Sequence, residues 1–437
     1  MTTPEPDKQQ LLLLRPRTLV AAVLLLSGMA SAPGWAQDGL PSEAAHHSGP
    51  PMRQQPYQPL TFSASYALQS DDNLLRLPNN GAMPPDPTRE AADRIGVGSL
   101  GLRFHTVQGL QELDVTANLV NYQYSENSAL NFTARNYDAA WRWFVTPRLH
   151  GNLTALQQER PTSSDPANSS SPNQQMQTSY RADAAYDFLG GSWQVLAGLS
   201  HAKLRMQYPV TPGQEYSSDT VDGGLRMGFG GGSFVKATLK TTRGKYLHSL
   251  ATLTNATTTP QAADLDFDQQ DADLRANWAI TTATTADSFI THIQRTHPRF
   301  ARRNFSGNHW GAGLAWAASA KSALSLRFLH ELGAYETPNS NYSETDHLSW
   351  GWSWNATSKT QLHIGQELAQ VAYRGSPFGL PASKRQDTLR DTSMTVRWQL
   401  HRQWQLATTL RQTSRAVNQP GLDYHSNQAS IAGQFTY

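Results

Sequence analysis

From Leu60 onward, apolar and polar positions alternate along the chain in segments of about 12 to 16 residues. A period of two is the pattern of a β-strand with one apolar face. In the segment from Lys321 to Glu336, the apolar parity carries Leu324, Leu326, Phe328 and Leu332. The other parity carries Ser325, Arg327 and Glu331. Strands of soluble proteins are usually about 5 to 6 residues long, so the length of these segments favours a membrane barrel over a soluble sandwich.

The pattern predicts eighteen strands, an even number, as in bacterial single-chain barrels. Short connections such as Gly230-Gly231-Gly232 follow the even strands, and long ones such as Leu247 to Asp264 follow the odd strands. We therefore predict an all-β fold, a closed antiparallel transmembrane β-barrel with short periplasmic turns and longer extracellular loops. The first strand should pair with the last, because backbone polar groups in hydrocarbon must all be paired. The predicted strands are 60–70, 92–106, 109–124, 131–146, 148–160, 178–189, 192–206, 217–229, 232–246, 265–281, 284–298, 304–319, 322–337, 342–357, 360–374, 385–399, 402–417 and 422–437.

Aromatic residues precede the short turns at one phase of this repeat and recur about every 40 residues. Such residues form a girdle at the membrane interface of barrels, although tryptophan at strand ends also packs soluble cores. The chain ends in Gln434-Phe435-Thr436-Tyr437, an ending of the type that barrel-assembly machinery commonly recognises. The predicted periplasmic girdle consists of Trp143, Phe188, Phe229, Trp278, Trp316, Trp354 and Trp398.

The N-terminal segment has the layout of a secretory signal peptide. Basic residues precede an apolar run from Leu19 to Leu26, and Gly34 and Ala36 bracket Trp35 at an A-x-A-like cleavage site. An uncleaved anchor is the alternative, but the run is shorter than the roughly 20 residues that a spanning helix needs. We expect a signal peptide at 1–36, a disordered periplasmic lead-in at 37–59 and the barrel at 60–437, located in the Gram-negative outer membrane after Sec export.

The composition excludes several classes of function. Charged residues make up 16% of the chain and the net charge is +2, too balanced for a nucleic-acid binder. The chain has no cysteine, which excludes disulfides, thiolate metal sites and a lipidated cysteine. Several histidines lie near Ser or Asp, but no Gly-flanked nucleophile turn is visible, and His46-His47 lacks ligand spacing. We expect neither an enzyme nor a cofactor or metal.

The polar parity of the strands mixes charges of both signs. Either these side chains form salt bridges along a solvated lumen, or they select what passes through it, as charged rings do in channels. Asp71 and Asp72 follow the first strand, and as neighbours on a strand they point to opposite faces, so only one can face the lumen. The candidate lumen-lining residues are Arg103, Arg142, Asp183, Arg226, Lys236, Asp273, Arg275, Arg327, Glu331, His363, Glu367, Asp387, Asp391, Arg397 and Arg411.

Five short strings, mostly at the outer ends of strands, resemble the exosortase-associated, EpsL-type outer-membrane β-barrel family. They are Asp71-Asp72-Asn73-Leu74-Leu75-Arg76-Leu77, Arg303-Asn304-Phe305-Ser306-Gly307, Glu331-Leu332-Gly333-Ala334-Tyr335-Glu336, Tyr342 to Asp346, and Gly421-Leu422-Asp423-Tyr424. The resemblance spans about Phe62 to Tyr437, and the segment from about Arg160 to Asp264 diverges. It implies a role in exopolysaccharide production beside a synthesis and export apparatus, and it implies no catalytic residues.

Three functions remain open at this stage. The first is a channel or scaffold for exopolysaccharide secretion, whose partners would be the polysaccharide and periplasmic export components. The second is a general or solute-specific diffusion porin. The third is a barrel enzyme or an adhesin. In each case the expected partners include outer-membrane lipids and the assembly machinery that binds the last strand, ending at Tyr437, and exclude nucleic acid.

Overall fold

The computed structural model describes residues 59–79, 90–162, 173–207, 215–247, 266–337, 340–376 and 384–437. The predicted signal peptide and all of the predicted lead-in except residue 59 fall outside these residues. The described part of the chain forms eighteen strands: β1 (Leu60–Asp71), β2 (Asp93–Gln108), β3 (Gln111–Tyr124), β4 (Phe132–Phe144), β5 (Leu149–Thr162), β6 (Asn173–Phe188), β7 (Trp193–Met206), β8 (Tyr216–Gly228), β9 (Phe234–Tyr246), β10 (Asp266–Thr281), β11 (Thr284–Thr296), β12 (Phe305–Trp316), β13 (Ser322–Thr337), β14 (Ser340–Asn355), β15 (Thr360–Arg374), β16 (Gln386–Gln399), β17 (Trp404–Val417) and β18 (Tyr424–Thr436).

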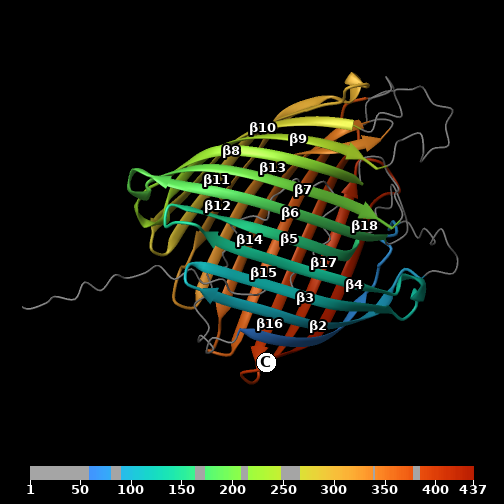
Figure 1. Ribbon diagram of the computed structural model, residues 1–437. Helices are drawn as coiled ribbons and strands as arrows, with labels where there is room; N and C mark the ends of the chain where they lie inside the picture. The colour runs from blue at the N-terminus through green and yellow to red at the C-terminus, as the bar shows by residue number, and fades with distance from the viewer. Residues whose placement is uncertain are drawn as a thin grey trace, which may run out of the picture. The chain divides into compact units, whose positions relative to one another are not determined.

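Each strand pairs antiparallel with the next, and the sheet closes on itself (Figure 1). Strand β1 pairs with β18 from Ser63↔Thr436 to Asp71↔Gln428. The predicted closed antiparallel barrel of eighteen strands is therefore confirmed. The largest error in a strand boundary is at β6, which begins at Asn173 rather than at 178. Residues 173–177, all polar except Met176, pair with β5 through their backbone, which needs no alternation of apolar side chains.

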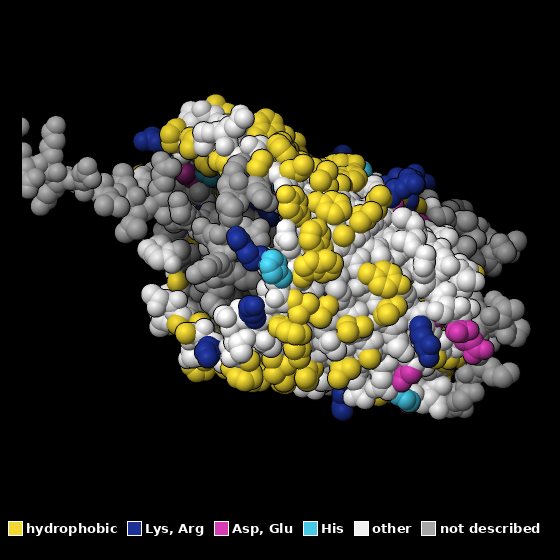
Figure 2. Space-filling view, turned by 90° about the horizontal axis from the view of Figure 1, so that it is seen from below, with side chains coloured by type: hydrophobic (Ala, Val, Ile, Leu, Met, Phe, Trp, Pro, Cys, Tyr) yellow, Lys and Arg dark blue, Asp and Glu magenta, His cyan; other side chains and the backbone are white. Residues whose placement is uncertain are grey.

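The two faces of the sheet differ in composition and burial. On β7, β8 and β9 the outward side chains Leu199, Val221 and Leu239 are 58, 60 and 70% exposed. Asp222 and Thr238, of the opposite parity, are buried. Successive residues of a strand point to opposite faces, so the apolar parity covers the outside of the barrel. Figure 2 shows the barrel from another side, where hydrophobic side chains also form a belt with charged side chains on either side of it.

The aromatic residues before the short turns lie mostly on this outer surface. Phe229, Trp278, Trp316, Trp354 and Trp398 are all exposed. Two of the short turns contain three-residue 3₁₀ segments, Leu189–Gly191 and Gly230–Gly232. Glycine is required at 231, where φ is +75°, because a side chain disfavours that conformation. Among the described residues, no helix is long and apolar enough to cross a membrane.

The pairing between β12 and β13 is interrupted toward the outer ends of these strands. It runs from Trp316↔Leu324 to Trp310↔His330 and stops there, although β13 continues to pair with β14 to Ala334↔Tyr342 and, after a shift in register, at Thr337↔Ser340. Beyond this point the wall splits, and Leu332 packs in a buried cluster with Ile293 and Phe305. We expected Leu332 to share the outer surface with Leu326. That expectation is wrong, because the outer end of β13 bends inward. Leu332 has the outward parity of its strand, yet it packs against side chains on the inner face of β11 and β12.

Candidate functional site

The inner wall on β2 to β4 is lined by cross-strand ion pairs. Arg103 contacts Asp114 through its Nη2 and Nε atoms, and His105 Nδ1 lies 3.3 Å from Asp114 Oδ2. Arg142 Nη1 lies 2.6 Å from Glu112 Oε1. Register explains the second pair, because Glu112 and Arg142 are direct cross-strand partners. Both predicted arginines of this region are therefore held by a carboxylate.

On β6 to β8 one arginine bridges two strands across a glycine. Arg181 donates to both carboxylate oxygens of Asp222, at 2.7 and 3.0 Å, and its Nε lies 3.6 Å from Asp183. Gly198 is the cross-strand partner of both aspartates. A Cβ at this glycine would lie 2.5 Å from Arg181 Nη2 and 2.7 Å from Asp222 Oδ2, so the ion pair occupies the space that a side chain would fill.

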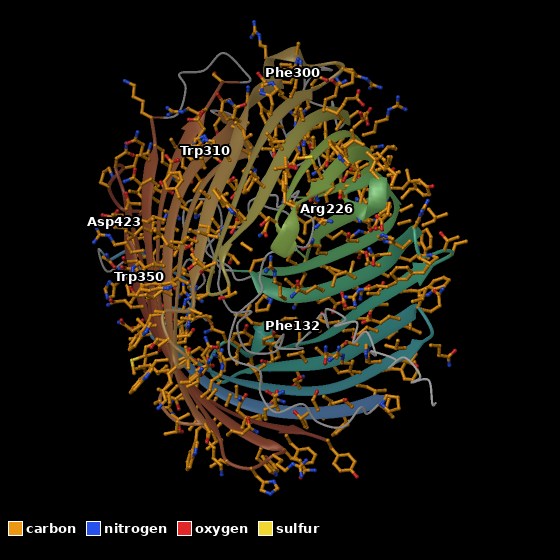
Figure 3. The ribbon with its side chains drawn as sticks, turned by 90° about the vertical axis from the view of Figure 1, so that its left-hand side faces the viewer. Phe132, Arg226, Phe300, Trp310, Trp350 and Asp423 are labelled. Atoms are coloured by element: carbon orange, nitrogen blue, oxygen red, sulfur yellow. The ribbon has the colours of Figure 1, made fainter. Side chains whose placement is uncertain are left out.

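A row of three cations crosses β8, β9 and β10. The register pairs Arg226 with Lys236 and Lys236 with Arg275. The Arg226 guanidinium lies 4.3 Å from the Phe234 ring centroid and donates to Gln194 at 2.9 Å. Arg226 is labelled in Figure 3, which looks into the barrel.

The third cation of this row is anchored by a buried carboxylate. Arg275 Nε lies 2.9 Å from Asp273 Oδ2, and Thr291 donates to the same carboxylate at 2.7 Å. Asp273 is 4% exposed. Arg275 and Thr291 therefore hold this carboxylate on the wall, whereas the register partners of Arg226 are Gln194 and Lys236.

Carboxylates gather on the wall formed by β13 to β17. His347 lies between two of them, with Nδ1 2.9 Å from Glu367 Oε1 and Nε2 3.7 Å from Glu331 Oε2. Asp391, the cross-strand partner of Glu367, lies 2.6 Å from Arg411 Nη2. Three acids, one arginine and one histidine therefore share this zone.

The four remaining predicted lumen-lining residues lie apart from both the row of cations on β8 to β10 and the carboxylates on β13 to β17. His363 Nδ1 lies 2.9 Å from Ser353 Oγ, and Arg397 donates to Gln361 at 3.5 Å. Arg327 lies in register between Gly313 and Ser349. Asp387 is 2% exposed and belongs to a buried cluster at the outer rim.

That rim cluster consists of ion pairs and an aromatic hydroxyl around Asp387. Arg385 Nη2 lies 2.7 Å from the carboxylate, Arg415 also contacts it, and Tyr373 donates to it at 3.0 Å. Arg385 and His347 are not among the lumen-lining residues that the sequence predicts. His347 shares the parity of Ser349 and Gly351 in its strand, a signal that would have found it.

Asp71 and Asp72 point to opposite faces, as their positions on a strand require. Asp71 is 1% exposed and contacts Arg76 and Ser426. Asp72 accepts hydrogen bonds from Asn427 at 2.7 and 2.8 Å. The first string of the family resemblance thus joins the connection after β1 to the last strand.

Several histidines pair with polar side chains on the outer surface. His201 Nδ1 lies 2.8 Å from Asp219 Oδ1, and His330 Nδ1 lies 2.7 Å from Asp346 Oδ1. His201 shares the outward parity of Leu199, and His330 shares that of Leu326. Among the residues that the structure describes, no group of three or more His, Cys, Asp or Glu is placed to hold a metal ion.

No protein-family model and no curated protein matches the chain. Solved structures do match. OccK9 (OpdG) of Pseudomonas aeruginosa aligns with a TM-score of 0.50 at 10% identity, covering 86% of this chain and 98% of that one. OpdK of Pseudomonas aeruginosa, crystallised with vanillate, gives 0.49 at 10% identity and covers 86 and 99%. The siderophore receptor PirA of the same organism gives 0.43 at 8% identity and covers 88 and 81%.

At these identities the likeness concerns the fold alone. The closed eighteen-stranded sheet and its outer apolar belt, together with the likeness of fold to OccK9, define the class of this protein as an outer-membrane β-barrel, in contact with membrane lipids. The family comparison does not support the resemblance to the EpsL-type family, which rests on its short strings.

Proposed function

We propose that the barrel is a passive diffusion channel for small charged or zwitterionic solutes, which it selects by two separate zones of opposite charge. The observation that carries this proposal is that the cationic row and the carboxylates lie on different strands of the wall. Arg226, Lys236 and Arg275 lie in one row on β8 to β10, and Glu331, Glu367 and Asp391 lie on β13 to β16. Charged rings and patches inside a pore raise the local concentration of ions of opposite sign and so set what passes.

Both zones face the inside of the barrel in this proposal. Their side chains have the parity opposite to the exposed apolar belt, and an eighteen-stranded barrel has room for an aqueous lumen. Members of the two zones have partners too, as Arg275 has in Asp273 and Asp391 has in Arg411, but each zone gathers several side chains of one sign. We assign solute selection to this excess of one charge, and we assign stiffening of the wall to the balanced ion pairs of Arg103 and Arg142.

Export of an exopolysaccharide remains the second candidate, with periplasmic export components as its partners. It is favoured only by the five short strings. Those described in the structure build rim contacts, such as Asp71 with Arg76 and Asn304 Oδ1 with the His297 backbone N–H. These contacts have a structural role that would explain the strings without a polysaccharide.

Single-channel recording separates the two candidates. The full-length mature protein in a planar bilayer should give stepwise, salt-dependent conductance with no added polysaccharide, because a passive channel needs no partner. Deletion of the gene should leave the cell-surface polysaccharide unchanged. Lost polysaccharide together with an electrically silent barrel would contradict the diffusion channel and favour export.

A further inference from the structure

A cluster of basic side chains lies on the outer surface of β7 and β9, immediately beyond the apolar belt. His201, Lys203 and Arg205 occupy the three outward positions of β7 that follow Leu199. On β9 the outward positions after Leu239 are Thr241, Arg243 and Lys245. The cluster therefore begins within about two outward steps of exposed leucines, each step being about 7 Å along the strand.

Strand register arranges this cluster in two rows. The row nearer the belt is His201–Asp219–Arg243 and the row farther out is Lys203–Ser217–Lys245. One strand, β8, lies between the two lysines, so two interstrand spacings place their Cα atoms roughly 10 Å apart, with the small side chain of Ser217 between them. Flexible lysine side chains at this separation can converge on one tetrahedral anion.

Three acids of outward parity border the cluster: Asp219, Asp268 and Asp266, which is the cross-strand partner of Lys245. Asp219 is bound by His201 at 2.8 Å, and Asp268 lies 3.8 Å from Arg243, whose side chain is 86% exposed. Lys203, Arg205 and Lys245 form no ion pair within the described part of the chain. Three cations that form no ion pair among the described residues are thus held next to a surface that lies in hydrocarbon.

We propose that β7 to β9 form a binding site for a phosphorylated lipid of the outer leaflet. Its phosphate lies over Ser217 between Lys203 and Lys245, with Arg205 beside it, and its acyl chains lie along Leu199, Val221 and Leu239. These three side chains are 58 to 70% exposed. A free phosphate would use only the cations, whereas a lipid satisfies the cations and the apolar surface below them together.

Native mass spectrometry of the folded full-length mature barrel in detergent tests the site, with diphosphoryl lipid A as the probe. The same lipid with both phosphates removed measures the contribution of the acyl chains, and inorganic phosphate measures that of the anion. The test variant is K203Q/R205Q/K245Q. The matched control is R94Q/R135Q/R390Q, which removes three exposed arginines of outward parity that are dispersed over β2, β4 and β16.

Wild-type protein should bind the phosphorylated lipid more tightly than the dephosphorylated one, also in the presence of EDTA. The test variant should lose roughly a hundredfold in affinity, about fivefold for each cation, while the control stays within about twofold. An equal loss in the control would show unspecific charge attraction and overturn the site. Equal binding of both lipids, competition by inorganic phosphate at the same concentration as the lipid, or loss of binding in EDTA would overturn it as well.

Discussion

Arg76 and Asp71 form a buried ion pair, with 3.0 Å between Nη1 and Oδ2, that links the connection after β1 to the last strand. The same Nη1 donates to Ser426 of β18 at 2.9 Å, and Ser426 and Gln428 each donate to Asp71 at 2.8 Å. This network lies at the outer end of the seam where the barrel closes. It gives the first resemblance string a mechanical role in closing the barrel that does not depend on any solute.

Replacement of Asp71 by Asn should destabilise the folded barrel by about 3 to 5 kcal/mol, because it leaves the Arg76 charge buried without its partner. Urea unfolding in lipid bilayers, followed by tryptophan fluorescence, measures the loss. D72N is the control, since Asp72 contacts Asn427 on the exposed side of the same seam. Equal and small effects of both substitutions would show that the ion pair does not hold the seam.

Two neighbouring positions of β13 should differ in how well they tolerate arginine, because one faces the lipid and the other faces the lumen. Leu326, the outward partner of Trp350, is 50% exposed, whereas Ser325 has the opposite parity. L326R should cost about 2 to 4 kcal/mol near the bilayer midplane, while arginine at position 325 is tolerated in a polar interior. Folding titrations of both variants into vesicles provide the measurement, and similar costs for the two would mean that the faces are assigned wrongly.

Gly198 should be intolerant of even a methyl group. In G198A the new Cβ meets the Arg181 guanidinium and the Asp222 carboxylate, and overpacking of this kind costs about 1 to 3 kcal/mol. G223A, whose Cβ would meet only the Leu196 carbonyl oxygen at 3.7 Å, should stay near wild type. A thermal unfolding comparison decides between them, and a harmless G198A would refute the packing of this pair.

The split between β12 and β13 can be tested by cross-linking, since the chain has no cysteine of its own. In the structure a Cβ at Gly307 would lie 3.8 Å from Leu332 Cγ, the position that a cysteine sulfur takes, so G307C/L332C should form a disulfide on oxidation. If the strand pairing continued past Trp310↔His330, Leu332 would instead face Asn308. Efficient oxidation of N308C/L332C and none of G307C/L332C would show an unbroken wall.

The sequence predicts the fold almost completely and the site only in outline, for a physical reason. Alternation and turn spacing are local properties of the chain, and they predict the strands, their number and the parity of Arg226 or Glu367. Which side chains meet depends on the register between strands that are far apart in the sequence, as with Arg181 and Asp222. Leu332 shows the limit clearly, because its parity is right but the wall around it bends inward.

The reversal potential in a salt gradient tests the proposed channel most directly. In a planar bilayer with a KCl gradient, E331A/E367A/D391A should shift the selectivity of the pore toward chloride relative to wild type, and R226Q/K236Q should shift it toward potassium. Opposite shifts are expected because each variant removes charge from one zone only. A reversal potential that both variants leave unchanged, in pores that still conduct, would contradict the account.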